Sequence, residues 1–205
     1  METVRHTKIV LLDGFFTLHC PQYIYKLLNE ARRHDVLVAF SAGGECVIKA
    51  NGAEDTYLPF VQRSHIVALN LNEFRAACHL ANVDCSDLKL ALKSFCQLSN
   101  DVVKTKLCRY ARIIVVTDGE NPVHCYTKED GLIVFPVQSL DANLIKDTTG
   151  AGDAFMAGFL YGIYCRKSIL ESLRIAYRTA VEIIQRVGCE IPDIPPNFID
   201  YQSNQ

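Results

Sequence analysis

The chain has 205 residues, of which 49% are hydrophobic, and this is enough to bury the core of one domain of ordinary size. Its formal net charge is −2 and its basic residues are scattered, which argues against nucleic acid or an anionic membrane surface as a partner. The polar start and the short apolar run behind it predict neither a signal peptide nor a membrane-spanning helix.

The nine cysteines show no Cys-x-x-Cys pair. An odd number without paired spacing argues against a disulfide framework and against a zinc site. Cys78-His79 with Cys85 could be read as a metal cluster, but one face of a helix explains these residues as well. We therefore expect reduced cysteines in an intracellular protein, located in the cytoplasm with the nucleus as a second location.

Short apolar runs alternate with helical patterns through the first two thirds of the chain. The runs predict buried strands at 9–12, 36–40, 66–69 and 113–116. The segments between them predict a helix starting near Pro21, a short helix over 55–63, and helices at roughly 72–82 and 86–99. This alternation is typical of a parallel sheet.

The remainder predicts a hairpin and two long helices. Apolar runs at 123–126 and 132–137 flank a charged, glycine-containing turn, which indicates an antiparallel hairpin. Helices are expected over 154–164 and 168–187, the second starting with the capping box Ser168-x-x-Glu171. We therefore predict one α/β domain over residues 1–205, an open, mostly parallel sheet flanked by helices, with an antiparallel hairpin near 123–137. Ligands of such sheets bind beyond the carboxyl ends of the strands.

The run Asp147-Thr148-Thr149-Gly150-Ala151-Gly152-Asp153 stands where a loop turns into a helix. Glycines let backbone N–H groups approach an anion closely, and the helix start adds free donors and the positive end of the dipole. Asp153 then places a carboxylate in the first turn. The run therefore predicts a phosphate site, although an ordinary glycine loop before a helix remains the alternative.

This run resembles the signature of the ribokinase-like carbohydrate and nucleoside kinases at every fixed position. The resemblance implies a ribokinase-like fold and ATP as the phosphoryl donor. It also implies that Gly150, Ala151 and Gly152 form the anion hole and that Asp153 accepts the proton of the substrate hydroxyl. Asp147 and Thr148 help to hold a monovalent cation such as K⁺ in some relatives, and a structured loop bend is the alternative for them.

Two further segments follow predicted strands. Asn70-Leu71-Asn72-Glu73 could be an ordinary helix start, whereas the resemblance implies that Asn70 and Glu73 help to place Mg²⁺ and the phosphates. A single carboxylate acting through water is sufficient for Mg²⁺. Thr117-Asp118-Gly119 could be a turn that ends a strand, whereas the resemblance implies that Thr117 and Gly119 border the nucleotide.

The order of the motifs is similar to that in the adenosine kinases of this family. It runs from Gly14-Phe15-Phe16 through Asn70-x-x-Glu73 and the glycine signature to Ile183-Ile184-x-Arg186-x-Gly188-Cys189-x-x-Pro192. A C-cap glycine followed by proline explains the last motif locally. The resemblance implies adenosine and ATP as ligands and transfer of the γ-phosphate to the adenosine 5′-hydroxyl, giving AMP in purine salvage.

The N-terminal sugar-binding and lid region of the family has no match in this sequence. We therefore expect a fold truncated at its N-terminus. Two alternatives to an active nucleoside kinase stay open, a catalytically weak nucleotide-binding or interaction module and a sugar kinase of the same superfamily. No sequence feature specifies an oligomeric state.

Overall fold

The computed structural model describes residues 2–50, 52–99, 102–188 and 190. They fall into two compact units, Met1–Val137 and Gln138–Gln205, and each is described by itself. The prediction of one domain over 1–205 therefore stays a prediction. Cys189 and Pro192 of the C-terminal motif lie outside the described residues.

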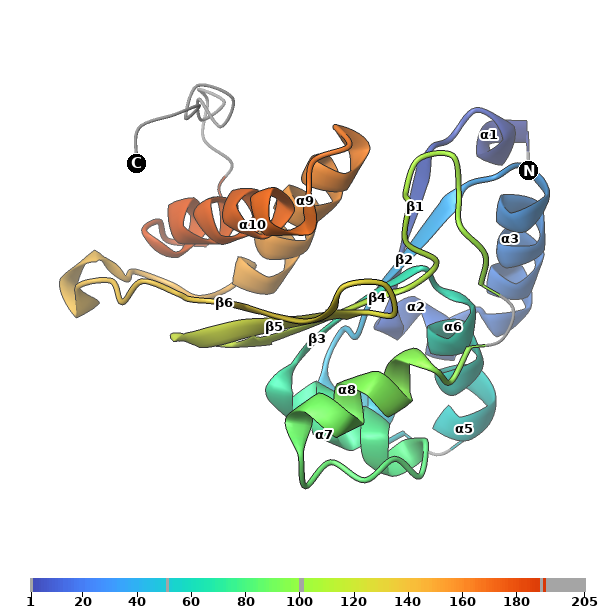
Figure 1. The fold of residues 1–205 in the computed structure, drawn as a ribbon, viewed down its shortest axis with the longest axis horizontal. Coiled ribbons are helices and arrows are strands. Elements are labelled where there is room, and N and C mark those ends of the chain that lie inside the picture. The colour runs from blue at the N-terminus through green and yellow to red at the C-terminus, as the bar shows by residue number, and fades with distance from the viewer. Residues whose placement is uncertain (1, 51, 100–101, 189, 191–205) are drawn as a thin grey trace. The chain divides into compact units, whose positions relative to one another are not determined.

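The first unit is built on a six-stranded sheet in which the strands lie in chain order (Figure 1). The first four strands are parallel to one another, and the last two continue the sheet antiparallel. This confirms the predicted mostly parallel α/β sheet and the hairpin near 123–137. The strands are β1 (Ile9–Asp13), β2 (Leu37–Ser41), β3 (Ile66–Asn70), β4 (Ile113–Asp118), β5 (Asn121–Thr127) and β6 (Gly131–Phe135).

Helices connect the parallel strands and lie against one face of the sheet (Figure 1). Those predicted near Pro21, over 72–82 and over 86–99 are observed with shifted ends. The helices of this unit are α1 (Glu2–Arg5), α2 (Gly14–His19), α3 (Pro21–Arg33), α4 (Glu45–Ile48), α5 (Ala53–Thr56), α6 (Leu58–Arg63), α7 (Leu71–Leu80) and α8 (Leu88–Cys96).

Two local features differ from the sequence-based expectations. The helix expected over 55–63 is split into α5 and α6, because Pro59 stands in the first turn of α6 and has no N–H to continue the preceding helix. A short helix, α2, follows β1 directly and was not expected. Asp13 caps it, since its Oδ1 accepts the Phe15 N–H at 2.8 Å.

One hydrophobic cluster fills the space between the sheet and these helices. Alternate residues of the strands point into it, for example Val38 and Phe40 of β2, and Phe40 packs edge-on against Tyr57 with ring centroids 5.1 Å apart. Phe74 and Phe95 join α7 to α8 in the same way at 5.3 Å. This packing holds the carboxyl ends of the strands in fixed positions.

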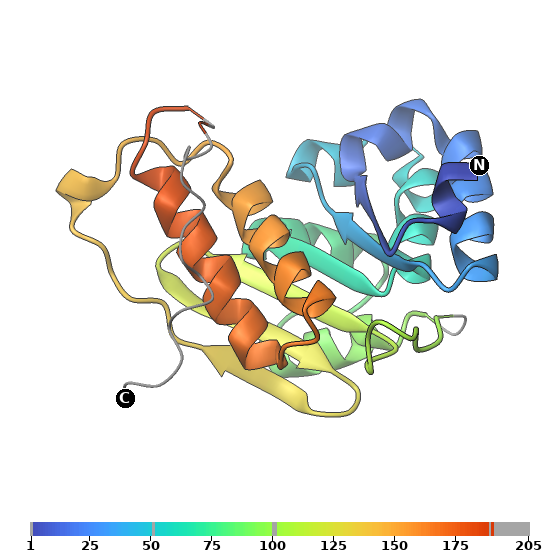
Figure 2. The same cartoon turned by 90° about the horizontal axis from the view of Figure 1, so that it is seen from above.

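The second unit contains a 3₁₀ turn, η1 (Ala142–Leu144), and two helices, α9 (Ala151–Tyr164) and α10 (Ile169–Ile184). The helices run side by side (Figure 2). Close packing depends on Gly158 and Gly162, where an added Cβ would lie 2.6 and 2.5 Å from side-chain oxygens of α10. The predicted capping box is confirmed, with Ser168 N–H bonded to Glu171 at 2.9 Å and Glu171 N–H to Ser168 at 3.2 Å.

Within the described ranges, no helix combines the length and apolarity needed to cross a membrane.

Candidate active site

The first unit brings several predicted site residues to one edge of its sheet. Asn70 and Thr117 are partners in the parallel register of β3 and β4, at the carboxyl end of both strands. Glu73 follows in the first turn of α7. This is the edge at which parallel sheets bind their ligands.

Asn70 and Glu73 bond to each other reciprocally. Asn70 Oδ1 accepts the Glu73 N–H at 2.9 Å, and Glu73 Oε2 accepts the Asn70 N–H at 2.8 Å. These bonds form a capping box that starts α7. The sequence left an ordinary helix start and a phosphate-placing role open, and the geometry accommodates both, because Glu73 Oε1 takes no part in the box.

The environment of Glu73 disfavours its charge. The side chain is half-buried, and this burial raises the pKa of the carboxyl above its ordinary value. The Asn70 N–H acts in the opposite direction, and the nearby Glu45 adds to the rise. A bound cation would offset both the cost of burying the charged Glu73 carboxylate and its repulsion by Glu45.

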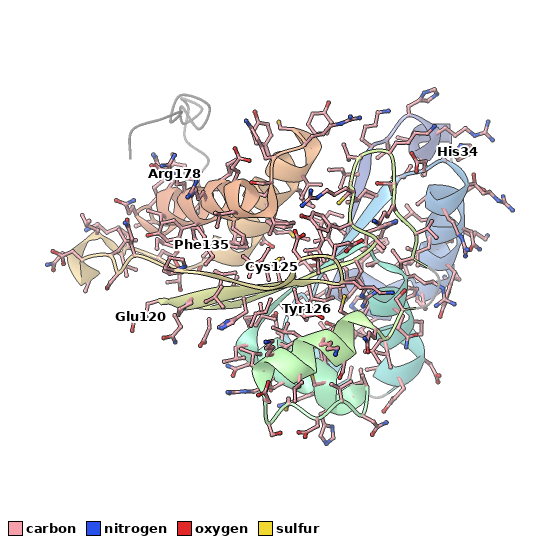
Figure 3. The ribbon with its side chains drawn as sticks, viewed as in Figure 1. His34, Glu120, Cys125, Tyr126, Phe135 and Arg178 are labelled. Carbon is pink, nitrogen blue, oxygen red and sulfur yellow. The ribbon has the colours of Figure 1, made fainter. Side chains whose placement is uncertain are left out.

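The residues Thr117 and Gly119 stand at the end of β4, as predicted. Asp118 pairs with Asn121 across a two-residue loop, and Gly119 has φ +56° there. Figure 3 shows Glu120, the other loop residue, at the tip of this hairpin. The turn therefore joins two antiparallel strands. An added Cβ at Gly119 would meet nothing within 4 Å, so the backbone at this tip is open to approach.

In the second unit, the glycine signature forms the start of α9 as predicted. Gly150 is the N-cap, with φ +77°, and Ala151 and Gly152 are the first two helical residues. The Ala151 N–H donates to Thr148 O at 3.2 Å. Within the described chain the Gly152 and Asp153 N–H groups have no acceptor, so they remain available to an anion.

Asp153 lies in the first turn of α9 and is exposed. An added Cβ at Gly152 would also meet nothing within 4 Å, so both residues border open space. This combination of free N–H groups and an exposed carboxylate can hold a phosphate and orient a hydroxyl group.

Asp147 is held more tightly than the sequence suggested. Its Oδ1 accepts the Thr149 N–H at 2.9 Å and its Oδ2 accepts the Gly188 N–H at 2.9 Å. The bonds from Thr149, and then the bond from Gly188, lower the pKa of the Asp147 carboxyl below its ordinary value. Thr148 is exposed and contributes its carbonyl to the turn.

Sequence reasoning missed one pair of turns at the carboxyl edge of the first unit. An added Cβ at Gly14 would lie 1.8 Å from Ala42 O, so the turn after β1 touches the turn after β2. Gly43 has φ +75°, and a Cβ there would lie 3.3 Å from Asp13 Oδ2. The sequence did contain a signal for this contact, the pair Gly43-Gly44, which two residues separate from the apolar run 36–40.

The residues present fit a Mg²⁺ ion that is held mostly by water and phosphate oxygens. Among the described residues no group of three or more His, Cys, Asp or Glu side chains could hold a metal ion by itself. Glu73 offers a carboxylate with one free oxygen, and Mg²⁺ commonly binds one or two carboxylates together with waters and phosphate oxygens.

Two features of the chain are typical of the α/β kinases of small molecules. One is a mostly parallel α/β sheet with polar strand ends, and the other is a helix that starts on a glycine turn with an aspartate in its first turn. The sequence profile of the pfkB family carbohydrate kinases matches residues 1–196. The chain therefore belongs to the pfkB family.

Individual proteins that are similar to this chain support its membership of this family. Adenosine kinase 1 of Arabidopsis thaliana is 40% identical over 194 residues, which are 94% of this chain and 54% of the relative. Adenosine kinase of Schistosoma mansoni, solved with 2-fluoroadenosine, has a TM-score of 0.82 at 24% identity, covering 93% of this chain and 54% of that one.

A third similar protein is adenosine kinase of Anopheles gambiae, solved with P1,P4-di(adenosine-5) tetraphosphate. Its TM-score is 0.80 at 25% identity, and the match covers 91% of this chain and 53% of the solved chain. These likenesses confirm the predicted fold. The chain spans about half the length of the relatives it matches.

Proposed function

We propose that the chain carries the phosphate-binding and proton-accepting part of an ATP-dependent nucleoside kinase. The reaction moves the γ-phosphate of ATP to the 5′-hydroxyl of adenosine and yields AMP and ADP, a step of purine salvage. The observation that supports this proposal most strongly is the start of α9, where free N–H groups stand next to the exposed Asp153. The match to adenosine kinase 1 at 40% identity supports the choice of adenosine.

In the proposed mechanism, the Gly150–Gly152 turn stabilises charge on the transferring phosphoryl group through the free Gly152 and Asp153 N–H groups and the positive end of the α9 dipole. Asp153 orients the 5′-hydroxyl and accepts its proton as the new P–O bond forms and the bond to the β-phosphate oxygen breaks. Phosphoryl transfer has a loose transition state, so positioning and charge stabilisation carry most of the catalysis.

The residues of the first unit are assigned supporting roles. Glu73 would hold Mg²⁺ through water, with Asn70 fixing the carboxylate, and the ion supplies charge neutralisation on the phosphates when bound. Thr117 and Gly119 would border the nucleotide. In the second unit, Asp147 and Thr148 would lie near a monovalent cation such as K⁺. For its location we propose the cytoplasm, with the nucleus as a second location.

The test is adenosine-dependent formation of ADP by the purified 205-residue chain with Mg²⁺ and ATP. We expect Asp153→Asn to lower turnover by about 10² or more while ATP is still bound. 5′-Deoxyadenosine, which lacks the acceptor hydroxyl, should give no product, and ribose and fructose test a sugar acceptor. Near-normal turnover of Asp153→Asn would disprove the role of Asp153.

A second candidate is a nucleotide-binding module without catalysis. It is favoured by the span of the match, which covers about half of each relative. Calorimetric binding of a non-hydrolysable ATP analogue by a chain that forms no ADP with any acceptor would select this candidate.

A further inference from the structure

The carboxylate of Asp147 joins two segments that are far apart in the chain. Oδ1 accepts the N–H of Thr149, two residues on, and Oδ2 accepts the N–H of Gly188, 41 residues on, both at 2.9 Å. The first bond shapes the turn that leads into Gly150. The second reaches across the whole of α9 and α10 to the turn behind α10. Both acceptors are ionised oxygens, which form stronger hydrogen bonds than neutral ones.

Backbone bonds reinforce the same junction. The Lys146 N–H donates to Ile184 O at 2.8 Å, and the Asp147 N–H donates to the same oxygen at 3.3 Å. Ile184 ends α10, so its carbonyl has no partner within the helix. Gly188 adopts φ +72°, a left-handed conformation typical of residues that follow a helix. The entry to the glycine turn is thus bonded to the end of α10 by side chain and backbone together.

We propose that Asp147 is a positioning residue that holds the Gly150–Gly152 turn in its phosphate-binding shape by clamping it to the turn behind α10. This inference rests on the proposed phosphate-binding function of that turn. The segment before α9 has little regular structure, with only η1 between Gln138 and Gly150, so local bonds must fix its course. Without these bonds the turn would bind phosphate more weakly, because its backbone would have to be ordered on binding at a cost in conformational entropy.

The clamp requires a carboxylate with two acceptor oxygens at this position. Asparagine offers one acceptor and one donor, so it can satisfy only one of the two N–H groups. Asp141 provides a matched control in the same unit. Its Oδ1 accepts the Asn143 N–H at 3.0 Å, which is the same local turn as at Asp147, and in the described chain its side chain bonds only to Asn143.

The experiment compares Asp147→Ala and Asp147→Asn with Asp141→Asn in the 205-residue chain. Amide hydrogen exchange is followed by NMR at Thr149, Gly150, Gly152 and Gly188, with Phe159 inside α9 as the reference for global unfolding. The dissociation constant of Mg²⁺–β,γ-methylene-ATP is measured by calorimetry in KCl and in choline chloride. The milder asparagine variant covers the case in which the alanine variant does not fold.

We expect Asp147→Ala to exchange at least tenfold faster at Gly188, with Phe159 unchanged, and to bind the analogue at least tenfold more weakly in either salt. Asp147→Asn keeps one acceptor oxygen, so it should exchange faster at Thr149 or at Gly188 and should also bind the analogue more weakly in either salt. Asp141→Asn should change each quantity less than twofold. Unchanged exchange at Gly188 in Asp147→Ala, or at both Thr149 and Gly188 in Asp147→Asn, overturns the clamp. An affinity loss that occurs in KCl but not in choline chloride also overturns it, because that result identifies Asp147 as a ligand of K⁺ only.

The failure of the proposed function is distinguishable from the failure of the clamp. A wild-type chain that does not bind the ATP analogue contradicts the phosphate-binding function. It then also contradicts the claim that Asp147 supports phosphate binding. The exchange rates at Gly188 decide independently whether the carboxylate joins the two segments.

Discussion

Asn70 and Glu73 exchange hydrogen bonds at 2.9 and 2.8 Å, so the two residues proposed to serve Mg²⁺ also start helix α7. The α10 box of Ser168 and Glu171 has the same reciprocal geometry without any proposed ligand. The chain therefore contains its own control for separating helix capping from metal binding.

The first prediction concerns Glu73→Gln. Glutamine can still accept the Asn70 N–H. The substitution also removes a negative charge that burial and Glu45 disfavour. The free energy of unfolding should therefore change by less than about 0.5 kcal/mol. Binding of the ATP analogue should lose its dependence on Mg²⁺. Urea unfolding and calorimetry with and without Mg²⁺ measure the two effects.

The matched variant is Glu171→Gln, which should leave the Mg²⁺ dependence as in the wild type. Asn70→Ala should lower the stability by about 1 kcal/mol, because it removes the cap of α7. If Glu171→Gln also removed the Mg²⁺ dependence, Glu73 would have no special role.

The second prediction concerns Gly152→Ala. An added Cβ meets nothing within 4 Å, so the variant should fold with unchanged or slightly higher stability. The methyl group would occupy the space through which a phosphate approaches the Gly152 and Asp153 N–H groups, so we expect affinity for the ATP analogue to fall at least tenfold. Thermal unfolding and calorimetry measure the two effects.

The control for Gly152→Ala is Ala157→Gly, at an exposed position of the same helix. This variant should be less stable by about 1 kcal/mol and should bind the analogue normally. Unchanged affinity of Gly152→Ala would show that no anion reaches this turn.

The third prediction concerns Gly14→Ala. The added Cβ would lie 1.8 Å from Ala42 O and 2.6 Å from Ala42 C, both backbone atoms, so the turns after β1 and β2 must separate. We expect a loss of about 3 kcal/mol of stability. Gly152→Ala makes the same chemical change in open space and serves as the control in urea unfolding. Equal stability of the two variants would contradict the close approach.

The fold was predictable from the sequence where a strand or helix start is encoded by residues within one short segment. β1 to β4 lie within two residues of the predicted runs. β2 to β4 are largely buried, as expected of continuously apolar strands in a parallel sheet. The expectation of burial was wrong for β1, which stands at the edge of the sheet with only Leu12 buried. The capping box at Ser168 was predicted because its partners are three residues apart, whereas at Asn70 only a helix start was predicted and the structure adds the box. Helix α2 was missed because Gly14-Phe15-Phe16 has no helical periodicity and only the Asp13 cap marks it.

The site was predictable only in part. The glycine signature at Gly150–Asp153 is a local pattern and was found at the start of α9. The bond from Gly188 to Asp147 spans 41 residues, and the contact of Gly14 with Ala42 depends on the register of β1 and β2. No local pattern encodes such long-range pairs, because they exist only after the chain has folded.

The fourth prediction concerns the pH dependence of stability through His65. This side chain is buried, and its Nδ1 accepts the Val38 N–H at 3.0 Å, which requires the neutral imidazole. Burial lowers the pKa of His65 below its ordinary value, and the charge of Arg112 acts in the same direction while Asp35 opposes it.

Because the pKa is lower in the folded state, the unfolded chain binds more protons between the folded pKa and about 6.5. The contribution of His65 is therefore complete above about pH 6.5 and is lost as the pH falls through this window. His65→Gln can still accept the Val38 N–H but does not titrate, so its free energy of unfolding should fall less between pH 7.5 and pH 5 than that of the wild type. His79→Gln, at an exposed position of α7, should follow the wild-type pH profile. Parallel urea profiles for wild type and His65→Gln would contradict the assignment.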